Sequence, residues 1–215
     1  MSSTATQPHY GIVVPVKPPA FAKSRLVGLG DAARRDLVVA FAADTVTAAL
    51  ASALVDLVLV VTDDVDLARG LAGLGAEVIP DGTTDDLNAS LQQGAAELHR
   101  RRPDLRIGAV CADLPALRPE ELTRALTAAA DVGQSFVADS DGAGTTALVA
   151  VSPEVFMPQF GAGSRAVHLS GGATEIDLAD IPTMRRDVDT PTDLVAALEL
   201  GVGTRTSLVT TGLRL

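Results

Sequence analysis

Short apolar runs alternate with helical segments along most of this chain, and this alternation limits the folds that are open to it. The run at 54–61 is nearly continuous in Val and Leu, which is typical of a strand buried on both faces of a parallel sheet. Strands that alternate with helices in this way form an α/β fold with a mainly parallel, doubly wound sheet. Strands are expected at residues 10–16, 54–61, 75–80, 107–112, 135–139 and 147–151. Helices are expected at residues 32–53, 65–74, 89–101, 119–130 and 192–200.

The length indicates a single domain. A chain of 215 residues can bury one substantial core, and it lies within the range of one α/β domain. We expect this domain to span residues 1–215, with a flexible segment at 1–9 and a C-terminal tail at 204–215. No internal repeat or low-complexity linker divides the sequence.

Composition excludes several classes of function. The formal charge of −10 comes from scattered acids with no basic stripe, so a nucleic-acid-binding surface is not expected. Cys111 is the only cysteine, which excludes a disulfide framework or a cysteine-based zinc site within one chain and fits a reducing cytosol. The N-terminus lacks the apolar core of a signal peptide, and no apolar run reaches membrane-spanning length. We therefore expect a cytoplasmic protein with no membrane partner.

The strand expected at 107–112 ends at a carboxylate. Asp113 follows the strand directly, and Leu114 and Pro115 come next, where the proline cannot continue a central strand. In open α/β sheets ligands bind beyond the carboxyl ends of the strands, so Asp113 is well placed to hold a metal ion or a ligand hydroxyl. The alternative is that Asp113 only caps the helix that follows.

The loop after the first expected strand carries positive charge. Lys17, Lys23 and Arg25 lie close together in an otherwise acidic chain. Because parallel sheets place their ligands at this edge, the loop is well suited to bind a phosphate group. A solvated basic loop is the alternative.

A second acidic pair lies near the end of the chain. Asp187 and Asp189 point the same way if their segment is extended, so their carboxylates can converge on one cation. Thr190 followed by Pro191 is also a good N-cap and first-turn pair for the next helix. Both interpretations can hold together.

Two glycine-containing segments suit an anion. Residues 142–146 combine glycines with two threonines, although a turn between two strands explains them equally well. In residues 160–165, glycines precede Ser164 and an arginine near a possible helix start. His168, a little further on, is expected on a helix surface or in packing rather than as a catalytic base. Asn88 is expected to cap a helix, although its amide could instead contact a base or ribose.

Cations in the first loop, Asp113 after a central strand and a late acidic pair can meet at one edge of the sheet. Carboxylates that face a cationic loop favour Mg²⁺-assisted chemistry on phosphates, in which the metal ion neutralises charge in the transition state. The sequence has neither a Walker A loop nor a Ser-His-Asp order, and the cationic loop lacks the G-x-G-x-x-G fingerprint.

Several short segments occur in an order that points to one family. They are VK at 16–17, AKSRL at 22–26, LN at 87–88, DLPAL at 113–117, GAGT at 142–145, FG at 160–161 with Ser164, and DVDTP at 187–191. Together they resemble the guanylyltransferases of coenzyme F420 biosynthesis, which act on phosphoenolpyruvate or 2-phospho-L-lactate. The resemblance covers nearly the whole chain and implies a nucleotidyltransferase fold of the GT-A type, a Rossmann-like αβα sandwich.

The resemblance also implies roles for individual residues. The catalytic residues would be Asp113, Asp187 and Lys23. A Mg²⁺ ion would be bound by Asp113, Asp187 and Asp189. The phosphorylated three-carbon acid would be held by Thr145, Gly161 and Ser164. The nucleotide would be bound by Lys17, Lys23, Arg25 and Asn88. Because Thr146 follows Thr145 directly, either hydroxyl could be the one that contacts the acceptor.

In the reaction that the resemblance implies, a phosphate oxygen of the acceptor attacks the α-phosphorus of GTP in line, and pyrophosphate leaves. The product would be enolpyruvoyl-2-diphospho-5'-guanosine, or its lactyl counterpart. Phosphoenolpyruvate, 2-phospho-L-lactate and 3-phosphoglycerate all remain open as the acceptor. The expected partners are GTP, the acceptor and the downstream transferase of the pathway, and the chain would act as a monomer or a homodimer.

Two other interpretations compete with this one. The first is a molybdenum-cofactor or sugar-phosphate nucleotidyltransferase of the same fold, but such enzymes share a G-G-x-G-x-R loop where this chain has Pro15, Val16 and Lys17. The second belongs to another class: a nucleotide-binding regulatory module without turnover. Metal-dependent product formation from GTP distinguishes the enzyme from the module.

Overall fold

The computed structural model describes residues 7–18, 23, 26, 28–83, 86–129 and 131–213. Residues 1–6, which belong to the segment expected to be flexible, lie outside the described residues, and so does Arg25. Within the described ranges, no helix is both long enough and apolar enough to cross a membrane.

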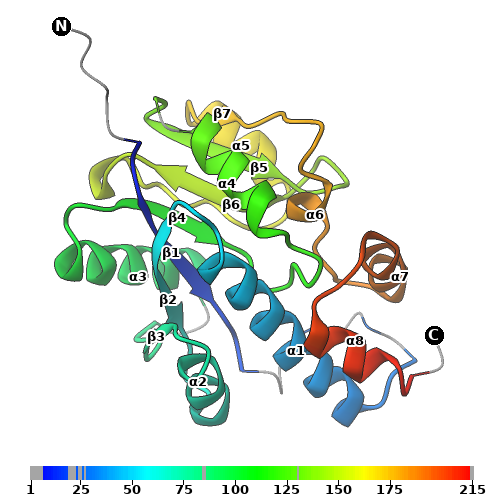
Figure 1. Cartoon of the computed structure of the whole chain (residues 1–215). Helices are drawn as coiled ribbons and strands as arrows, with labels where there is room; N and C mark the ends of the chain where they lie inside the picture. The colour runs from blue at the N-terminus through cyan, green and yellow to red at the C-terminus, as the bar shows by residue number, and fades with distance from the viewer. Residues whose placement is uncertain are drawn as a thin grey trace, which may run out of the picture.

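A seven-stranded sheet in the order β3-β2-β1-β4-β6-β5-β7 forms the middle layer of the molecule (Figure 1). Its strands are β1 (Tyr10–Pro15), β2 (Val55–Val61), β3 (Glu77–Ile79), β4 (Arg106–Val110), β5 (Gln134–Ala138), β6 (Thr145–Ala150) and β7 (Thr174–Glu175). β6 pairs antiparallel with both of its neighbours, whereas the other pairs are parallel. The expected mainly parallel α/β sheet is therefore confirmed, with β6 running against the other strands.

Helices cover both faces of this sheet. They are α1 (Asp31–Leu50), α2 (Val65–Ala72), α3 (Leu87–Arg101), α4 (Pro119–Ala128), α5 (Ser164–Ser170), α6 (Pro182–Arg185), α7 (Pro191–Leu200) and α8 (Thr204–Thr210), with a short 3₁₀ turn η1 (Pro153–Val155). Residues of α1, α2, α4 and α6 share one apolar core, and residues of α3 share the core on the other face with Phe156, which follows η1. The αβα sandwich expected from the sequence is confirmed.

The alternation of side chains along β1 explains the two cores. Ile12 and Val14 lie in the core beneath α1, and Val13 lies in the core beneath α3. Successive side chains of a strand point to opposite faces, so a run of β-branched residues fills both cores at once. The central strands are thereby fixed, and the loops that follow them are carried at one edge of the sheet.

Residues 204–210, which we expected in a C-terminal tail, form α8 instead. The helix lies beside α1 (Figure 1), and its first N–H groups are bound by a buried carboxylate of α1: Asp44 accepts from Arg205 at 3.1 Å and from Thr206 at 2.8 Å. The cap is a side chain from a distant part of the sequence, so local pattern gave no sign of it.

Candidate active site

Asp113 lies in the turn just beyond the end of β4, the strand next to β1 in the sheet. The fully buried Thr45 of α1 fixes this turn, because its hydroxyl donates to the carbonyl of Ala112 and accepts from the N–H of Leu114, both at 3.2 Å. Arg118 occupies the N-cap position of α4. The alternative that Asp113 only caps this helix is therefore wrong, and its carboxylate is directed to the crevice beyond the strands.

The late acidic pair is joined to the same turn through the backbone. The N–H of Val188 donates to the carbonyl oxygen of Asp113 at 3.1 Å, which places Asp187 and Asp189 on either side of that link. Thr190 caps α7 as expected and forms a capping box with Asp193. The Asp193 carboxylate also accepts from the N–H of Asp189 at 3.2 Å, so two successive N–H groups of the acidic segment are held.

Lys23 lies between two of the three acids. Its ammonium pairs with the carboxylates of Asp113 and Asp189, and its side chain is only 12% exposed. Burial alone would lower the pKa of Lys23, but the attraction of the Asp113 and Asp189 carboxylates outweighs it, so the pKa is raised above its ordinary value. The backbone of Lys23 has a φ of 57°, in the left-handed region that few residues other than glycine adopt. A permanently charged ammonium is therefore held at the acids.

The surroundings of Asp187 shift its pKa. Burial, with repulsion from the Asp113 and Asp189 carboxylates, raises the pKa of Asp187 to about 7. The Oδ1 atom of Asp113 is buried and has no hydrogen-bond partner among the described residues. Crowded carboxylates and an unpartnered carboxylate oxygen fit a divalent cation that takes oxygen ligands.

The acids do not by themselves enclose a metal ion. Within the described ranges, no three acidic, histidine or cysteine side chains are arranged as a ready metal-binding group. This arrangement fits Mg²⁺, which is usually held by one or two carboxylates together with water and substrate phosphates. The protein therefore offers part of the oxygen ligands that a Mg²⁺ ion needs, and the phosphates of a nucleotide can provide others.

Cys111 lies beside the acids but is a packing residue. Its thiol donates to the carbonyl of Thr145 at 3.6 Å, and burial, reinforced by Asp113 and Asp187, raises the pKa of the thiol well above its ordinary value. A thiol with a raised pKa is a poor nucleophile.

The glycine loop between β5 and β6 is closed by Asp139. Its carboxylate accepts from the N–H of Ala143 at 2.9 Å and from the N–H of Gly144 at 2.7 Å. A Cβ on Gly144 would lie 2.4 Å from the Oδ2 atom of Asp139, so a larger residue there would displace this carboxylate. The loop is the turn of an antiparallel hairpin, and it brings the start of β6 to the same edge as the end of β4.

The two threonines after this loop have different surroundings. Thr145 forms hydrogen bonds of 3.0 Å with the hydroxyl of Ser164 and with Nδ1 of His168. The hydroxyl of Thr146 instead donates to the carbonyl of Val137 at 3.4 Å, and Thr146 is fully buried. Of the two threonines, Thr145 is therefore the one that lies with Ser164. His168 is buried, as expected of a packing residue, and it does not lie on the helix surface.

Asn88 connects α3 to the loop that carries Gly161. Its amide donates to the carbonyl of Phe160 at 3.1 Å, and its Oδ1 accepts from the N–H of Phe160 at 2.8 Å. Asp86, not Asn88, caps α3. The backbone of Gly161 has a φ of 138°, which favours glycine at this position. Asn88 therefore sets the position of this loop through both of its amide atoms.

The structure brings most of the predicted residues to one edge of the sheet. Lys23 meets the acids directly, and Lys17 lies exposed just after β1 at the same edge. Thr145, which is hydrogen-bonded to Ser164, is joined to the Asp113 segment through Cys111, which lies two residues before Asp113 and whose thiol donates to the Thr145 carbonyl. This edge includes the point between β1 and β4 where the strand order reverses, which is where α/β sheets bind ligands.

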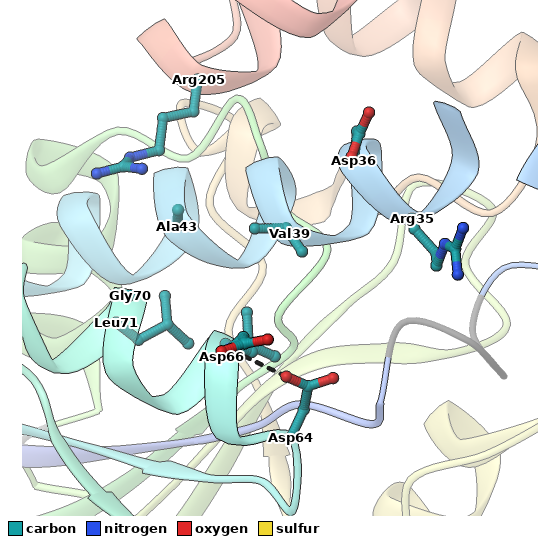
Figure 2. A pocket seen from close by; sticks show the side chains of 10 residues that line it. Arg35, Asp36, Val39, Ala43, Asp64, Asp66, Gly70, Leu71 and Arg205 are labelled. Carbon is teal, nitrogen blue, oxygen red and sulfur yellow. Dashed lines mark hydrogen bonds between the residues drawn. The ribbon is translucent and has the colours of Figure 1, made fainter. Parts of the chain in front are cut away.

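A groove of about 520 Å³ lies elsewhere, between α1 and α2 (Figure 2). Val39 of α1 and Leu71 of α2 lie on its two sides, and Arg205 of α8 lies at one end. None of the predicted site residues that the structure describes lines this groove. It is therefore a feature of the outer helical layer and not the candidate active site.

Sequence reasoning missed the contacts through which three residues shape the site. Thr45, Asp139 and His168 act through hydrogen bonds to groups that are distant in sequence or in a neighbouring loop. Asp139 carried a weak signal, because an acid that precedes a glycine turn is suited to bind the N–H groups of that turn. Thr45 carried none, since it lies within a helix of ordinary composition.

The fold and the acidic cluster define the class of protein. A candidate nucleotide-diphospho-sugar transferase from Desulfovibrio desulfuricans aligns with a TM-score of 0.71 over 95% of this chain and 95% of that one, at 17% identity. A Mycobacterium tuberculosis protein solved in complex with manganese aligns with a TM-score of 0.57 over 90% of this chain and 100% of that one, at 22% identity. At such identities the likeness establishes the fold, which is that of the nucleotidyltransferases.

Sequence comparison narrows the class to a family. The model of the guanylyl transferase CofC-like family matches residues 10–214, and the chain belongs to this family. Phosphoenolpyruvate guanylyltransferase of Thermomonospora curvata is 53% identical over 199 residues, covering 92% of this chain and 87% of that one. The protein of the same name from Streptomyces scabiei is 52% identical over 204 residues, covering 93% and 94%. The resemblance found in the sequence is confirmed, and the two competing interpretations are not favoured.

Proposed function

We propose that this chain transfers GMP from GTP to the phosphate of phosphoenolpyruvate and releases pyrophosphate. The observation that carries the proposal is the meeting of Asp113, Asp187, Asp189 and Lys23 at one edge of a nucleotidyltransferase fold. Family membership and the names of the relatives support the choice of GTP and of this acceptor. The reaction would serve coenzyme F420 biosynthesis in the cytoplasm, with the product handed to the next transferase.

For this reaction the protein must position the substrates and supply charge, and it need not provide a strong general base. A phosphate oxygen of the acceptor bonds to the α-phosphorus of GTP while the bond from that phosphorus to the bridging oxygen breaks, and pyrophosphate takes the electron pair. A phosphate monoester is already anionic at neutral pH, so no strong general base is needed. Lys23 supplies a fixed positive charge where the triphosphate would lie, and Lys17 and Arg25 would add to it.

Asp113 and Asp187, with Asp189 beside them, would hold Mg²⁺, and the unpartnered Oδ1 atom of Asp113 supports this assignment. A bound Mg²⁺ ion supplies neutralisation of the phosphate charge that develops in the transition state. The chain's own contribution is to fix the acids on the two linked turns. Thr145, Gly161 and Ser164 would bind the acceptor.

The test is a panel of acceptors read by pyrophosphate release and product mass. With GTP and Mg²⁺, phosphoenolpyruvate should react fastest, ahead of 2-phospho-L-lactate and 3-phosphoglycerate. Asp113→Asn and Asp187→Asn should each lower the rate by about 100-fold or more while remaining folded, because each removes charge from the metal site. The surface variant Asp66→Asn, whose side chain is 90% exposed, is the matched control and should react at the wild-type rate. Wild-type rates in both site variants would sink the proposal.

A further inference from the structure

His168 of α5 is a buried imidazole with both ring nitrogens engaged. Its ring lies between those of Phe136 and Phe160, with centroid distances of 5.3 Å and 5.8 Å, and the residue is 2% exposed. Nε2 accepts from the backbone N–H of Gln159 at 3.1 Å, and Nδ1 lies 3.0 Å from the hydroxyl oxygen of Thr145. No role in the reaction has so far been given to this residue.

These contacts determine which nitrogen carries the proton. A backbone N–H can only donate, so Nε2 must be unprotonated to accept from Gln159. A neutral imidazole has one proton, which then lies on Nδ1, and Nδ1–H donates to Thr145. Burial lowers the pKa of His168, which maintains the neutral form that this pattern requires.

A β-bulge brings Thr145 to the face where His168 lies. Ala138 pairs with Thr145, but Val137 pairs with Ala147, so Thr146 is an extra residue in β6. Without this extra residue, Thr145 would share the face of Ala147, two positions along the strand. The bulge instead places Thr145 on the same face as Ala138, in the core that contains Phe136 and Phe160.

The hydroxyl groups of Thr145 and Ser164 carry two protons, and the contacts among the residues that the structure describes use only one of them. The hydroxyls of Thr145 and Ser164 share one hydrogen bond, so one of their two protons is used between them. His168 fills an acceptor position on Thr145 by donating to it, and neither hydroxyl has another partner in the described part of the chain. One hydroxyl proton therefore remains to be donated to a ligand.

We propose that His168 is a positioning residue that directs this hydroxyl proton of the Thr145–Ser164 pair toward an anionic oxygen of the acceptor. The inference rests on the proposed function, since an acceptor with phosphate and carboxylate oxygens offers only hydrogen-bond acceptors to the site. If no group donates to Thr145 from the position of Nδ1, the Thr145 hydroxyl can rotate and point its proton toward residue 168. The Thr145–Ser164 pair then no longer holds a hydrogen-bond donor in a fixed direction.

Two amide variants separate the two nitrogens. In His168→Asn, the side-chain NH₂ can replace Nδ1 as a donor to Thr145, whereas in His168→Gln the carbonyl oxygen can replace Nε2 as an acceptor for Gln159. The KM for phosphoenolpyruvate should rise about tenfold or more in His168→Gln and about threefold or less in His168→Asn, because one hydrogen bond to an anion is lost only in the first. The KM for GTP should change by less than about twofold in both.

Thermal unfolding confirms that each variant is folded before kinetics are compared. Three results would overturn the proposal: an equal rise in the phosphoenolpyruvate KM in the two variants, no rise in His168→Gln, or a rise in the GTP KM as large as that for phosphoenolpyruvate. The ¹⁵N NMR spectrum of the wild-type protein tests the tautomer independently of activity, and a proton on Nε2 would also overturn it. A wild-type protein that releases no pyrophosphate with any acceptor would instead count against the proposed function, and the NMR result would still decide the inference.

Discussion

The backbone N–H of Val188 donates to the backbone carbonyl of Asp113 at 3.1 Å, joining segments that are far apart in the sequence. Val188 itself is fully buried in a small core with Leu37 and Phe41 of α1. The backbones of the two acidic segments are thus held near one another by this contact and by packing, while Lys23 bridges the carboxylates of Asp113 and Asp189. Because the carboxylates are not needed to form the backbone link, replacing one by an amide should leave the backbone of the site intact.

The raised pKa of Asp187 predicts how the metal-free protein responds to pH. The pKa is about 7 in the folded chain, against an ordinary value of 3.8, so the folded state binds the proton more tightly than the unfolded state does. The contribution of Asp187 to stability is therefore fully present below about pH 4 and is lost as the pH rises to about 7. In EDTA, the difference in unfolding temperature between Asp187→Asn and wild type should shift in favour of the variant over this range. Parallel curves for Asp187→Asn and wild type would refute the prediction.

Loss of the Thr45 hydroxyl should disturb both stability and activity. Thr45→Val keeps the shape of the side chain but leaves the N–H of Leu114 and the carbonyl of Ala112 without this partner in a buried region. The expected cost is about 1–3 kcal/mol in the free energy of unfolding, measured by urea titration. The rate of pyrophosphate release should fall as well, because this turn carries Asp113. Thr45→Ser retains the hydroxyl and is the control; a stable, fully active Thr45→Val protein would show that the turn needs no such support.

Gly144→Ala should act on the acceptor rather than on the nucleotide. The new Cβ would lie 2.4 Å from the Asp139 carboxylate, which must shift and release the N–H groups that close the glycine loop. Thr145 follows directly, so the KM for the acceptor should rise by about tenfold while that for GTP changes little. Gly133→Ala, where a Cβ would meet nothing within 4 Å, is the control and should behave as wild type. Steady-state kinetics with each substrate varied in turn will decide.

Asp44→Ala should loosen α8. The Asp44 carboxylate accepts from the N–H groups of Arg205 and Thr206 at the start of this helix, and losing such a cap costs about 0.5–2 kcal/mol. Hydrogen exchange should become faster in residues 204–210, and the unfolding temperature should fall. Asp36 is an exposed residue of the same helix, α1, and Asp36→Ala should leave hydrogen exchange in α8 unchanged. Unaltered exchange in Asp44→Ala would mean that packing alone holds α8.

The sequence was sufficient for six of the seven strands and for the acids, because both depend on local pattern; it missed the two-residue strand β7. A run of apolar residues that ends at a carboxylate predicts both a buried strand and the edge of the sheet at which the acid lies, as the segment before Asp113 shows. The contacts that set the acids and hydroxyls in place could not be predicted, because they join residues that are distant in sequence. Asn88 with Phe160 is an example, since both amide atoms are used by a segment 72 residues away. The reversal of β6 was also hidden, because strand direction depends on pairing.

The reversed direction of β6 has a consequence for how such a site can diversify. Parallel strands reach the ligand edge at their carboxyl ends and need long crossovers, so changing one of their loops risks moving a helix. β6 reaches the same edge at its beginning, through a hairpin turn closed by Asp139. The turn can lengthen, shorten or change sequence without altering the crossovers that carry Asp113 and the first loop. The fold thus lets the hairpin turn vary independently of the turn that carries Asp113.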